Sequence, residues 1–181
     1  MANVNLVNSV LSQGKKKEML EEISKTFGAT PAMFRAIGNS ESALESMWGS
    51  FKALGKGKIG AQLGEQIAVA VADVNRCEYC LAAHTKLGIG AGLSPDIMKE
   101  AQLGKSNDPK TLAVLDFSVK LTKKKGKVTK EDLDELRKFG YGDDEIAEII
   151  AHVALNIFTN YTNIALGVDV DFPKIPLSNL A

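Results

Sequence analysis

The chain contains 181 residues, of which 45% are hydrophobic and 24% are charged, the balance of a globular protein in water. Its 22 basic and 22 acidic residues cancel, so the composition gives no reason to expect binding to nucleic acid or to an anionic membrane. The length fits a single domain over 1–181, with tails at 1–14 and 168–181, and no apolar run approaches a membrane span. The basic run at 15–17 follows a mixed segment, the reverse of a secretory signal, so we expect a cytoplasmic protein.

Signals for helix starts recur along the first half of the chain. A capping residue followed by proline predicts helices that begin at Thr30-Pro31, Ser94-Pro95 and Asp108-Pro109. Gly104 supplies a stop for the second of these helices.

The second half continues in the same way. Thr129 and Asp132 form a capping pair, and Gly140 ends the short helix that follows. Asp143 or Asp144 caps a long final helix that runs to about residue 166. No stretch alternates as a strand does, so the fold class that we predict is all-α.

A weak internal repeat relates two of the predicted helical segments. The stretch 65–88 aligns with 145–167 when Ile67 is placed opposite Ile146. The apolar positions are shared, whereas the polar ones differ: the pairs are Cys77 with Asn156, Cys80 with Thr159, and His84 with Asn163. If the repeat is real, the helical frame does not require thiols or imidazole at these positions, which favours a chemical role for the first copy.

Cys77 and Cys80 are the only cysteines in the sequence. A bridge between them closes a very small loop and constrains the unfolded chain little, so a structural staple explains them poorly. Three roles remain: redox chemistry, metal binding, or two thiols packed in the core.

His84 lies four residues after Cys80, which on a helix places both side chains on one face. The imidazole can then take the proton of the thiol and leave a nucleophilic thiolate. Asn75 is a plausible N-cap of this helix, which puts Cys77 in the first turn, where the helix terminus favours an anion. Histidine spacing therefore favours Cys80 as the reactive thiol, and the helix terminus favours Cys77.

Glu65 joins these residues only if the chain folds back on itself. A turn near Asp73–Asn75 gives Glu65 and His84 rises of about 15 Å and 14 Å from the turn, so an antiparallel helical pair brings them level. The carboxylate can then orient the imidazole and support its charged form. The resulting hypothesis is a relay in which Glu65 steadies His84, His84 deprotonates Cys80, and Cys77 resolves the product as a disulfide.

These and nearby residues also admit roles other than the relay. Glu65, Cys77, Cys80 and His84 are acceptable zinc ligand types, but the short spacing crowds a tetrahedral site, so we expect no metal. His152 has no cysteine near it in the sequence and is interpreted as a packed or capping residue. Tyr79 either packs on a neighbouring helix or shapes substrate access. Three apolar residues at helical spacing are assigned to the core or a subunit interface, with a substrate pocket as the alternative: Met47, Trp48 and Phe51.

The pattern E-x11-C-x2-C-x3-H, present as GEQIAVAVADVNRCEYCLAAH, resembles the signature of the alkylhydroperoxidase D-like, or carboxymuconolactone decarboxylase, superfamily. The stretch N-x-C-x-Y-C-x-x-A-H is similar to its peroxidase-related branch. The motif covers about 20 residues, and the helical frame extends a looser resemblance over most of the chain. The resemblance implies an all-α bundle, with the CxxC helix in an antiparallel pair, that assembles into homotrimers or homohexamers.

The resemblance also implies thiol-dependent reduction of hydroperoxides. It maps the peroxide-reducing thiol onto Cys80, the resolving thiol onto Cys77, and the proton relay onto Glu65 and His84. It implies no bound cofactor but an external dithiol reductant, for which lipoylated and thioredoxin-like proteins are candidates. The family prototype has a histidine between the cysteines where this chain has Tyr79, which puts direct supply of electrons from a lipoylated partner in doubt. The paired cysteines argue against lactone decarboxylation.

Two other functions stay open at this point. The same thiols can serve a protein disulfide reductase or redox relay, or a non-catalytic oligomeric redox sensor. The peroxidase is favoured because a carboxylate and an imidazole accompany the thiols, which a simple disulfide switch does not need.

Overall fold

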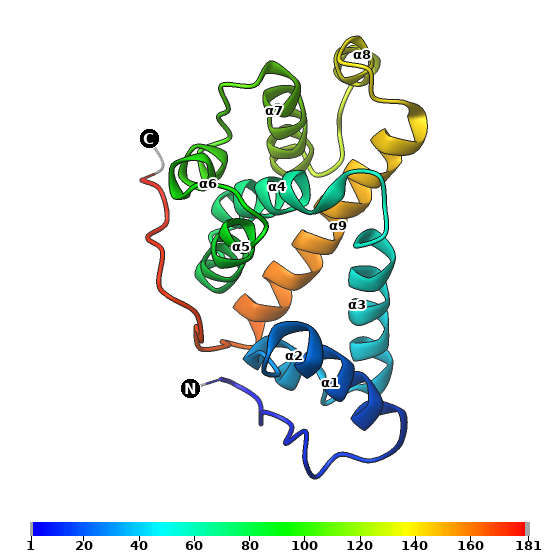
Figure 1. The fold of residues 1–181 in the computed structure, drawn as a ribbon, viewed down its shortest axis with the longest axis vertical. Helices are drawn as coiled ribbons and strands as arrows, with labels where there is room; N and C mark the ends of the chain where they lie inside the picture. The colour runs from blue at the N-terminus through cyan, green and yellow to red at the C-terminus, as the bar shows by residue number, and fades with distance from the viewer. Residues whose placement is uncertain (1, 180–181) are drawn as a thin grey trace.

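The computed structural model describes residues 2–179, and this part of the chain forms nine α-helices and no strand (Figure 1). The predicted all-α fold class is therefore confirmed. Three residues of the predicted tails lie outside the described part: Met1, Leu180 and Ala181. The helices are α1 (Gly14–Phe27), α2 (Ala32–Ile37), α3 (Glu41–Leu54), α4 (Gly60–Val74), α5 (Glu78–Gly90), α6 (Pro95–Gln102), α7 (Pro109–Lys123), α8 (Lys130–Lys138) and α9 (Asp143–Ala165).

Most of the predicted helix starts are confirmed. The side chains of Ser94 and Asp108 cap α6 and α7, and Thr129 forms a capping box with Asp132 at the start of α8. The predicted caps of α2 and α9 were wrong. Pro31 is itself the N-cap of α2 and no Thr30 cap forms, while the cap of α9 is Gly142, whose N–H donates to Glu145.

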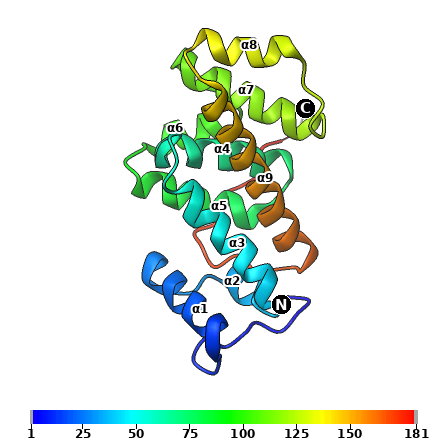
Figure 2. The same cartoon turned by 90° about the vertical axis from the view of Figure 1, so that its right-hand side faces the viewer.

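Helix α4 occupies the centre of the molecule and packs against α5, α6, α7 and α9. Its run from Gly64 to Asp73 is buried and rich in alanine and valine, so neighbouring helices can approach its backbone closely. The α1–α2 and α7–α8 segments lie at opposite ends of the molecule, and α9 extends along it between them (Figure 2).

The turn between α4 and α5 sets the two cysteines in place. The prediction that Asn75 caps the second helix was wrong, because Asn75 ends α4 and Cys77 is the N-cap of α5. Arg76, between them, has φ of 60°, a left-handed conformation that reverses the chain over very few residues. Cys77 thus lies at the helix terminus itself, and Cys80 lies in the first turn.

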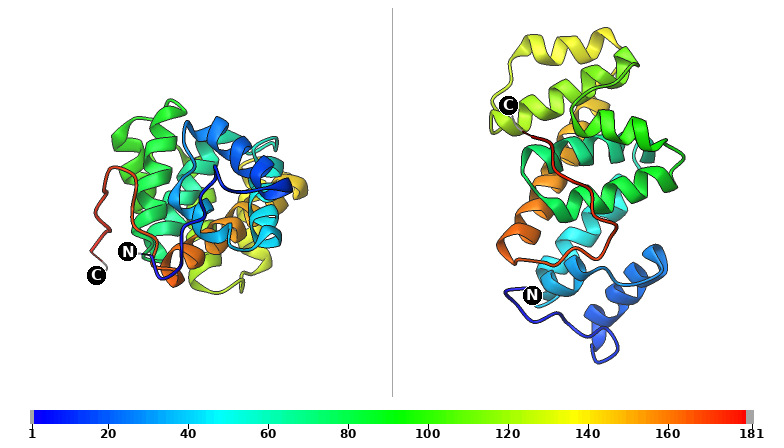
Figure 3. Two further views of the ribbon diagram at one scale, coloured as in Figure 1. Left: turned by 90° about the horizontal axis from the view of Figure 1, so that it is seen from below. Right: turned by 90° about the vertical axis from the view of Figure 1, so that its left-hand side faces the viewer.

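The segments before α1 and after α9 form no helix but pack on the helical body. The Asn3 N–H donates to the Leu166 carbonyl over 2.7 Å. At the other end, buried Asp73 accepts a 2.8 Å hydrogen bond from the Ser178 N–H and another from the Ser178 hydroxyl. The segment 168–179, which we call the C-terminal strap, runs along the face formed by α5 and α6 (Figure 3, right). Within residues 2–179, no helix is long and apolar enough to cross a membrane.

Candidate active site

Glu65 on α4 and His84 on α5 meet as the antiparallel geometry predicts. Nδ1 of His84 lies 2.7 Å from Oε2 of Glu65, and both side chains are largely shielded from solvent. Burial disfavours the imidazolium, but the adjacent carboxylate outweighs it, so the pKa of His84 is raised above its usual value. The contact therefore favours the protonated, positively charged form of the imidazole.

Cys80 is a buried thiol surrounded by groups that favour its anion. Asn163 Nδ2 donates to Cys80 Sγ over 3.1 Å, and the Cys80 thiol faces Thr159 Oγ1 at 3.8 Å. Burial opposes ionisation, but the hydrogen bond with Cys77, the charge of His84 and the Asn163 amide together lower the Cys80 pKa to about 6. Cys80 is thus a thiolate at neutral pH.

Cys77 has the opposite electrostatic character. Its Sγ caps α5 by accepting the Cys80 N–H at 3.4 Å, and it is also buried. The hydrogen bond that it gives the Cys80 anion, together with burial, raises the pKa of Cys77 above its usual value. Since the backbone of Cys80 also lies in the first helical turn, the helix terminus does not single out Cys77, and the lower pKa belongs to Cys80.

Helix α9 contributes a polar row that sequence reasoning did not assign to the site. The row faces Cys80 and Asn75, and all of its members are buried: Asn156, Thr159, Asn160 and Asn163. These residues include the repeat partners of Cys77, Cys80 and His84, so the second copy of the repeat packs against the first and supplies the environment of its thiol. The signal was available as four polar residues at positions i, i+3, i+4 and i+7, which share one face of a helix.

A small apolar cavity, the Cys80 cavity, opens onto the reactive thiol and His84. Its volume is about 30 Å³, room for about two water-sized groups. Aromatic and aliphatic side chains form the rest of its wall: Phe27, Pro31, Met33, Phe34, Phe51, Tyr79, Ala83, Leu87 and Phe172. An apolar molecule that carries a compact reactive group fits this lining better than a charged one.

A second cavity, of about 150 Å³, lies on the other side of the ion pair. Glu65, His84 and His152 line it together with Phe51. His152 packs on Gly64, where a Cβ would come within 3.1 Å of the imidazole, and burial lowers its pKa. His152 is a packed residue, as the sequence indicated, although it shares a cavity with the relay.

The other residues for which the sequence left two roles open lie either in the core or in a cavity wall. Met47 and Trp48 are buried in the core, whereas half-buried Phe51 lines both cavities. Tyr79 is buried, stacks edge-on against Phe172 and accepts the Met33 N–H at 3.2 Å. Tyr79 therefore packs and also forms part of the cavity wall.

The described residues offer no cluster of metal ligands. Across residues 2–179, no three histidine, cysteine or acidic side chains converge as metal ligands. The largest hollow near the ion pair is the 150 Å³ cavity, and a groove of about 320 Å³ between α7 and α8 has no thiol or histidine.

Solved structures share this all-helical fold. A peroxidase-related protein from Ralstonia eutropha JMP134, described as an alkylhydroperoxidase D core, superposes with a TM-score of 0.86 at 21% identity over 94% of this chain and 92% of that one. A peroxidase-related protein from Silicibacter sp. TM1040 gives 0.80 at 21% identity over 93% and 91%. The debrominase Bmp8 gives 0.75 at 21% identity over 86% of each chain. The fold is thus that of alkylhydroperoxidase D-like proteins.

One family model matches part of the sequence. Residues 41–105, which include all four predicted site residues, match the model of the carboxymuconolactone decarboxylase family. No curated protein matches the chain. The chain thus resembles this family over residues 41–105, the part that holds the motif, and shares the fold of alkylhydroperoxidase D-like proteins.

Proposed function

We propose that this protein is a thiol peroxidase that reduces organic hydroperoxides through Cys80 and Cys77. One observation supports this most strongly: a buried thiolate, stabilised by Asn163 and the Glu65–His84 pair, faces a small apolar cavity. A metal-free peroxide reduction needs such a nucleophile, an acid for the leaving group, and an opening that admits the compact O–O group to the thiolate.

The first step consumes the hydroperoxide. The Cys80 thiolate attacks the terminal oxygen, the O–O bond breaks, and its electron pair leaves with the alkoxide. His84, as imidazolium, protonates the alkoxide to the alcohol, while Glu65 holds the ring by the 2.7 Å contact. Cys80 becomes a sulfenic acid, having been oxidised by two electrons.

The second step forms the disulfide. Once Cys80 is an uncharged sulfenic acid, the anion that raised the Cys77 pKa is gone, so Cys77 can ionise. Its thiolate attacks Cys80 Sγ, the S–O bond breaks, and the hydroxide takes a proton and leaves as water. In this proposal the neutral imidazole of His84 accepts the proton of Cys77 and passes it to the hydroxide. An external dithiol then restores the two thiols, and no cofactor is required.

A single-turnover experiment tests the proposal. Reduced protein, freed of reductant, receives one equivalent of cumene hydroperoxide, and both sulfurs are mapped by mass spectrometry. We expect rapid formation of the Cys77–Cys80 disulfide, multiple turnovers with dithiothreitol, and loss of turnover in Cys80→Ser. Full turnover in Cys80→Ser, or thiols that oxidise no faster than free cysteine, would refute the peroxidase. Fast exchange with a protein disulfide and negligible peroxide consumption would instead identify a disulfide reductase.

Reductive debromination of an aromatic ring is a second candidate. The Cys80 cavity is lined largely by aromatic rings, and the structurally similar debrominase Bmp8 was solved as a C82A variant in complex with 2,3,4-tribromopyrrole. In such a reaction the thiolate takes bromine from the ring carbon, the ring gains a proton, and Cys77 displaces bromide as the disulfide forms. Bromide release from tribromopyrrole, measured on the same protein sample, decides between the two substrates.

A further inference from the structure

The two cysteines open onto different hollows. Cys80 lines the apolar Cys80 cavity, whereas Cys77 lines a separate surface hollow of about 230 Å³. Tyr79, between them in the sequence, lines both hollows and so forms the partition. We call the second one the Cys77 hollow; its other walls include Arg76, Glu78, Asn163, Ile164, Val168 and Val170.

We propose that the Cys77 hollow is the binding site for the reductant: a small dithiol enters there and attacks the sulfur of Cys77, while the peroxide enters through the Cys80 cavity. The inference rests on the proposed function only in that the peroxide reaction produces the disulfide. It assigns separate entrances to the two half-reactions.

Charge and polarity distinguish the two entrances. The attacking group is a thiolate, and moving an anion into the small apolar Cys80 cavity would cost its hydration. The Cys77 hollow is open, and the exposed charged side chains of Arg76 and Glu78 both line it, so an entering anion can keep part of its hydration. Cys77 also stands at the N-terminus of α5, where unpaired N–H groups favour an approaching anion.

Asn163 connects the hollow with the leaving group. Its Nδ2 donates to Cys80 Sγ at 3.1 Å, and its Oδ1 is buried with no hydrogen-bond partner among the described residues. The same side chain lines the Cys77 hollow. The unpaired Oδ1 can accept the S–H of the second thiol of the reductant, while Nδ2 stabilises the sulfur that departs.

The exchange consists of two successive displacements at sulfur. A thiolate of the reductant attacks Cys77 Sγ, the Cys77–Cys80 bond breaks, and its electron pair stays on Cys80 as thiolate. The second thiol of the reductant, as thiolate, then attacks the reductant's own sulfur in the mixed disulfide and releases Cys77, which takes up a proton. The reductant leaves as a cyclic disulfide. Attack at Cys77 is the favourable direction because Cys80, with a pKa of about 6, is the better leaving group.

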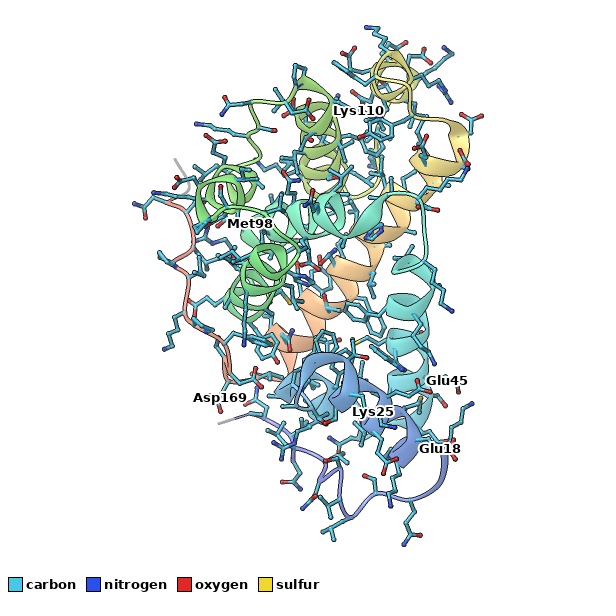
Figure 4. The ribbon with its side chains drawn as sticks, in the orientation of Figure 1. Glu18, Lys25, Glu45, Met98, Lys110 and Asp169 are labelled. Carbon is cyan, nitrogen blue, oxygen red and sulfur yellow. The ribbon has the colours of Figure 1, made fainter. Side chains whose placement is uncertain are left out.

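The depth of Cys77 limits the size of the reductant. Cys77 is only 1% exposed, and its hollow is walled by Val168 and Val170 of the C-terminal strap. Asp169, labelled in Figure 4, lies between these two residues on the outside of the molecule. A thiol fixed on the surface of a folded protein would be stopped at this wall, so the hollow suits a dithiol on a short aliphatic chain.

The test separates the two half-reactions in the intact chain. The Cys77–Cys80 disulfide is prepared with diamide, which makes the experiment independent of any peroxide reaction, and its reduction by dithiothreitol is followed by timed alkylation. Ile164→Trp places a large side chain at the hollow and should slow reduction at least tenfold, leaving oxidation by cumene hydroperoxide within twofold. Ile150→Trp is the matched control, because it introduces the same change at another half-exposed site on α9.

Two further measurements make the result decisive. Ala83→Leu narrows the Cys80 cavity and should slow oxidation but not reduction. When 2-mercaptoethanol replaces dithiothreitol and N-ethylmaleimide stops the reaction, the mixed disulfide should be on Cys77 and the label on Cys80. A mixed disulfide on Cys80, or reduction slowed by Ala83→Leu and not by Ile164→Trp, would overturn the proposal. If reduction behaves as expected but no peroxide is consumed, only the peroxidase function fails.

Discussion

Replacing His84 with glutamine tests the electrostatic account of the reactive thiol. The amide keeps roughly the size of the imidazole and can still donate to Glu65, but it has no positive charge. At its pKa of about 6, Cys80 is ~90% thiolate at pH 7. Without the imidazolium, burial dominates, and we expect the Cys80 pKa to return to ~8.5 or above, which leaves ~3% thiolate at pH 7.

The readout is the titration itself, followed by thiolate absorbance at 240 nm between pH 4 and 10. Reaction rates are a weaker readout, because intrinsic nucleophilicity rises with the pKa and offsets part of the ~30-fold loss of thiolate. Circular dichroism checks that the variant is folded. His152→Gln is the matched control, since His152 lines only the neighbouring cavity, and should titrate as wild type. A His84→Gln midpoint within half a unit of wild type would refute the reasoning.

Three further predictions follow from the same packing. Asn163→Leu removes an amide that donates to a charged sulfur and should raise the Cys80 midpoint in the same titration by ~1–2 units; an unchanged midpoint would contradict the contact. In Cys80→Ser, the raised pKa of His84 stabilises the fold fully below ~6.5 and less as pH rises through the folded pKa, so urea midpoints should fall from pH 6 to 8. In wild type, folding lowers the Cys80 pKa, so ionisation of Cys80 makes the fold more stable as pH rises. This offsets the loss from His84, and the urea midpoints should stay nearly level. Gly88→Ala should cost ~1–3 kcal/mol in urea unfolding because its Cβ would overlap the buried methionine of α6, while Gly90→Ala, with open space, should stay within ~1 kcal/mol of wild type.

The steric basis of the Gly88 prediction is the contact between α5 and α6. Met98, labelled in Figure 4, is 1% exposed and its sulfur packs directly on the backbone of Gly88. A midpoint for Gly88→Ala equal to that of Gly90→Ala would show that Met98 repacks freely.

The local part of the site could be predicted from the sequence. The position of the turn and the rise of a helix were enough to bring Glu65 level with His84, because both residues belong to one helical pair. The N-cap of α5 is Cys77, two residues after the predicted Asn75, because Arg76 adopts the left-handed conformation. Glycine and asparagine adopt this conformation more readily than arginine does.

The rest could not be predicted because it depends on how distant segments pack. Asn163 reaches Cys80 across 83 positions, and no local pattern states which face of α9 meets which face of α5. The repeat aligned Asn163 with His84, but two aligned positions need not be in contact, and Asn163 in fact contacts Cys80. The separate hollows of Cys77 and Cys80 likewise depend on the C-terminal strap, which the sequence indicated only as a non-helical tail.

The distance in sequence between Cys80 and Asn163 also bears on how the protein acquires its chemistry as it folds. The α4–α5 hairpin has local contacts and can form early, whereas docking of α9 is a non-local event that comes later. Until α9 docks, Cys80 lacks the amide that lowers its pKa, and its thiol behaves more nearly as an ordinary cysteine. In partly folded molecules Cys80 is therefore less reactive, so its reactivity reports native packing in refolding experiments.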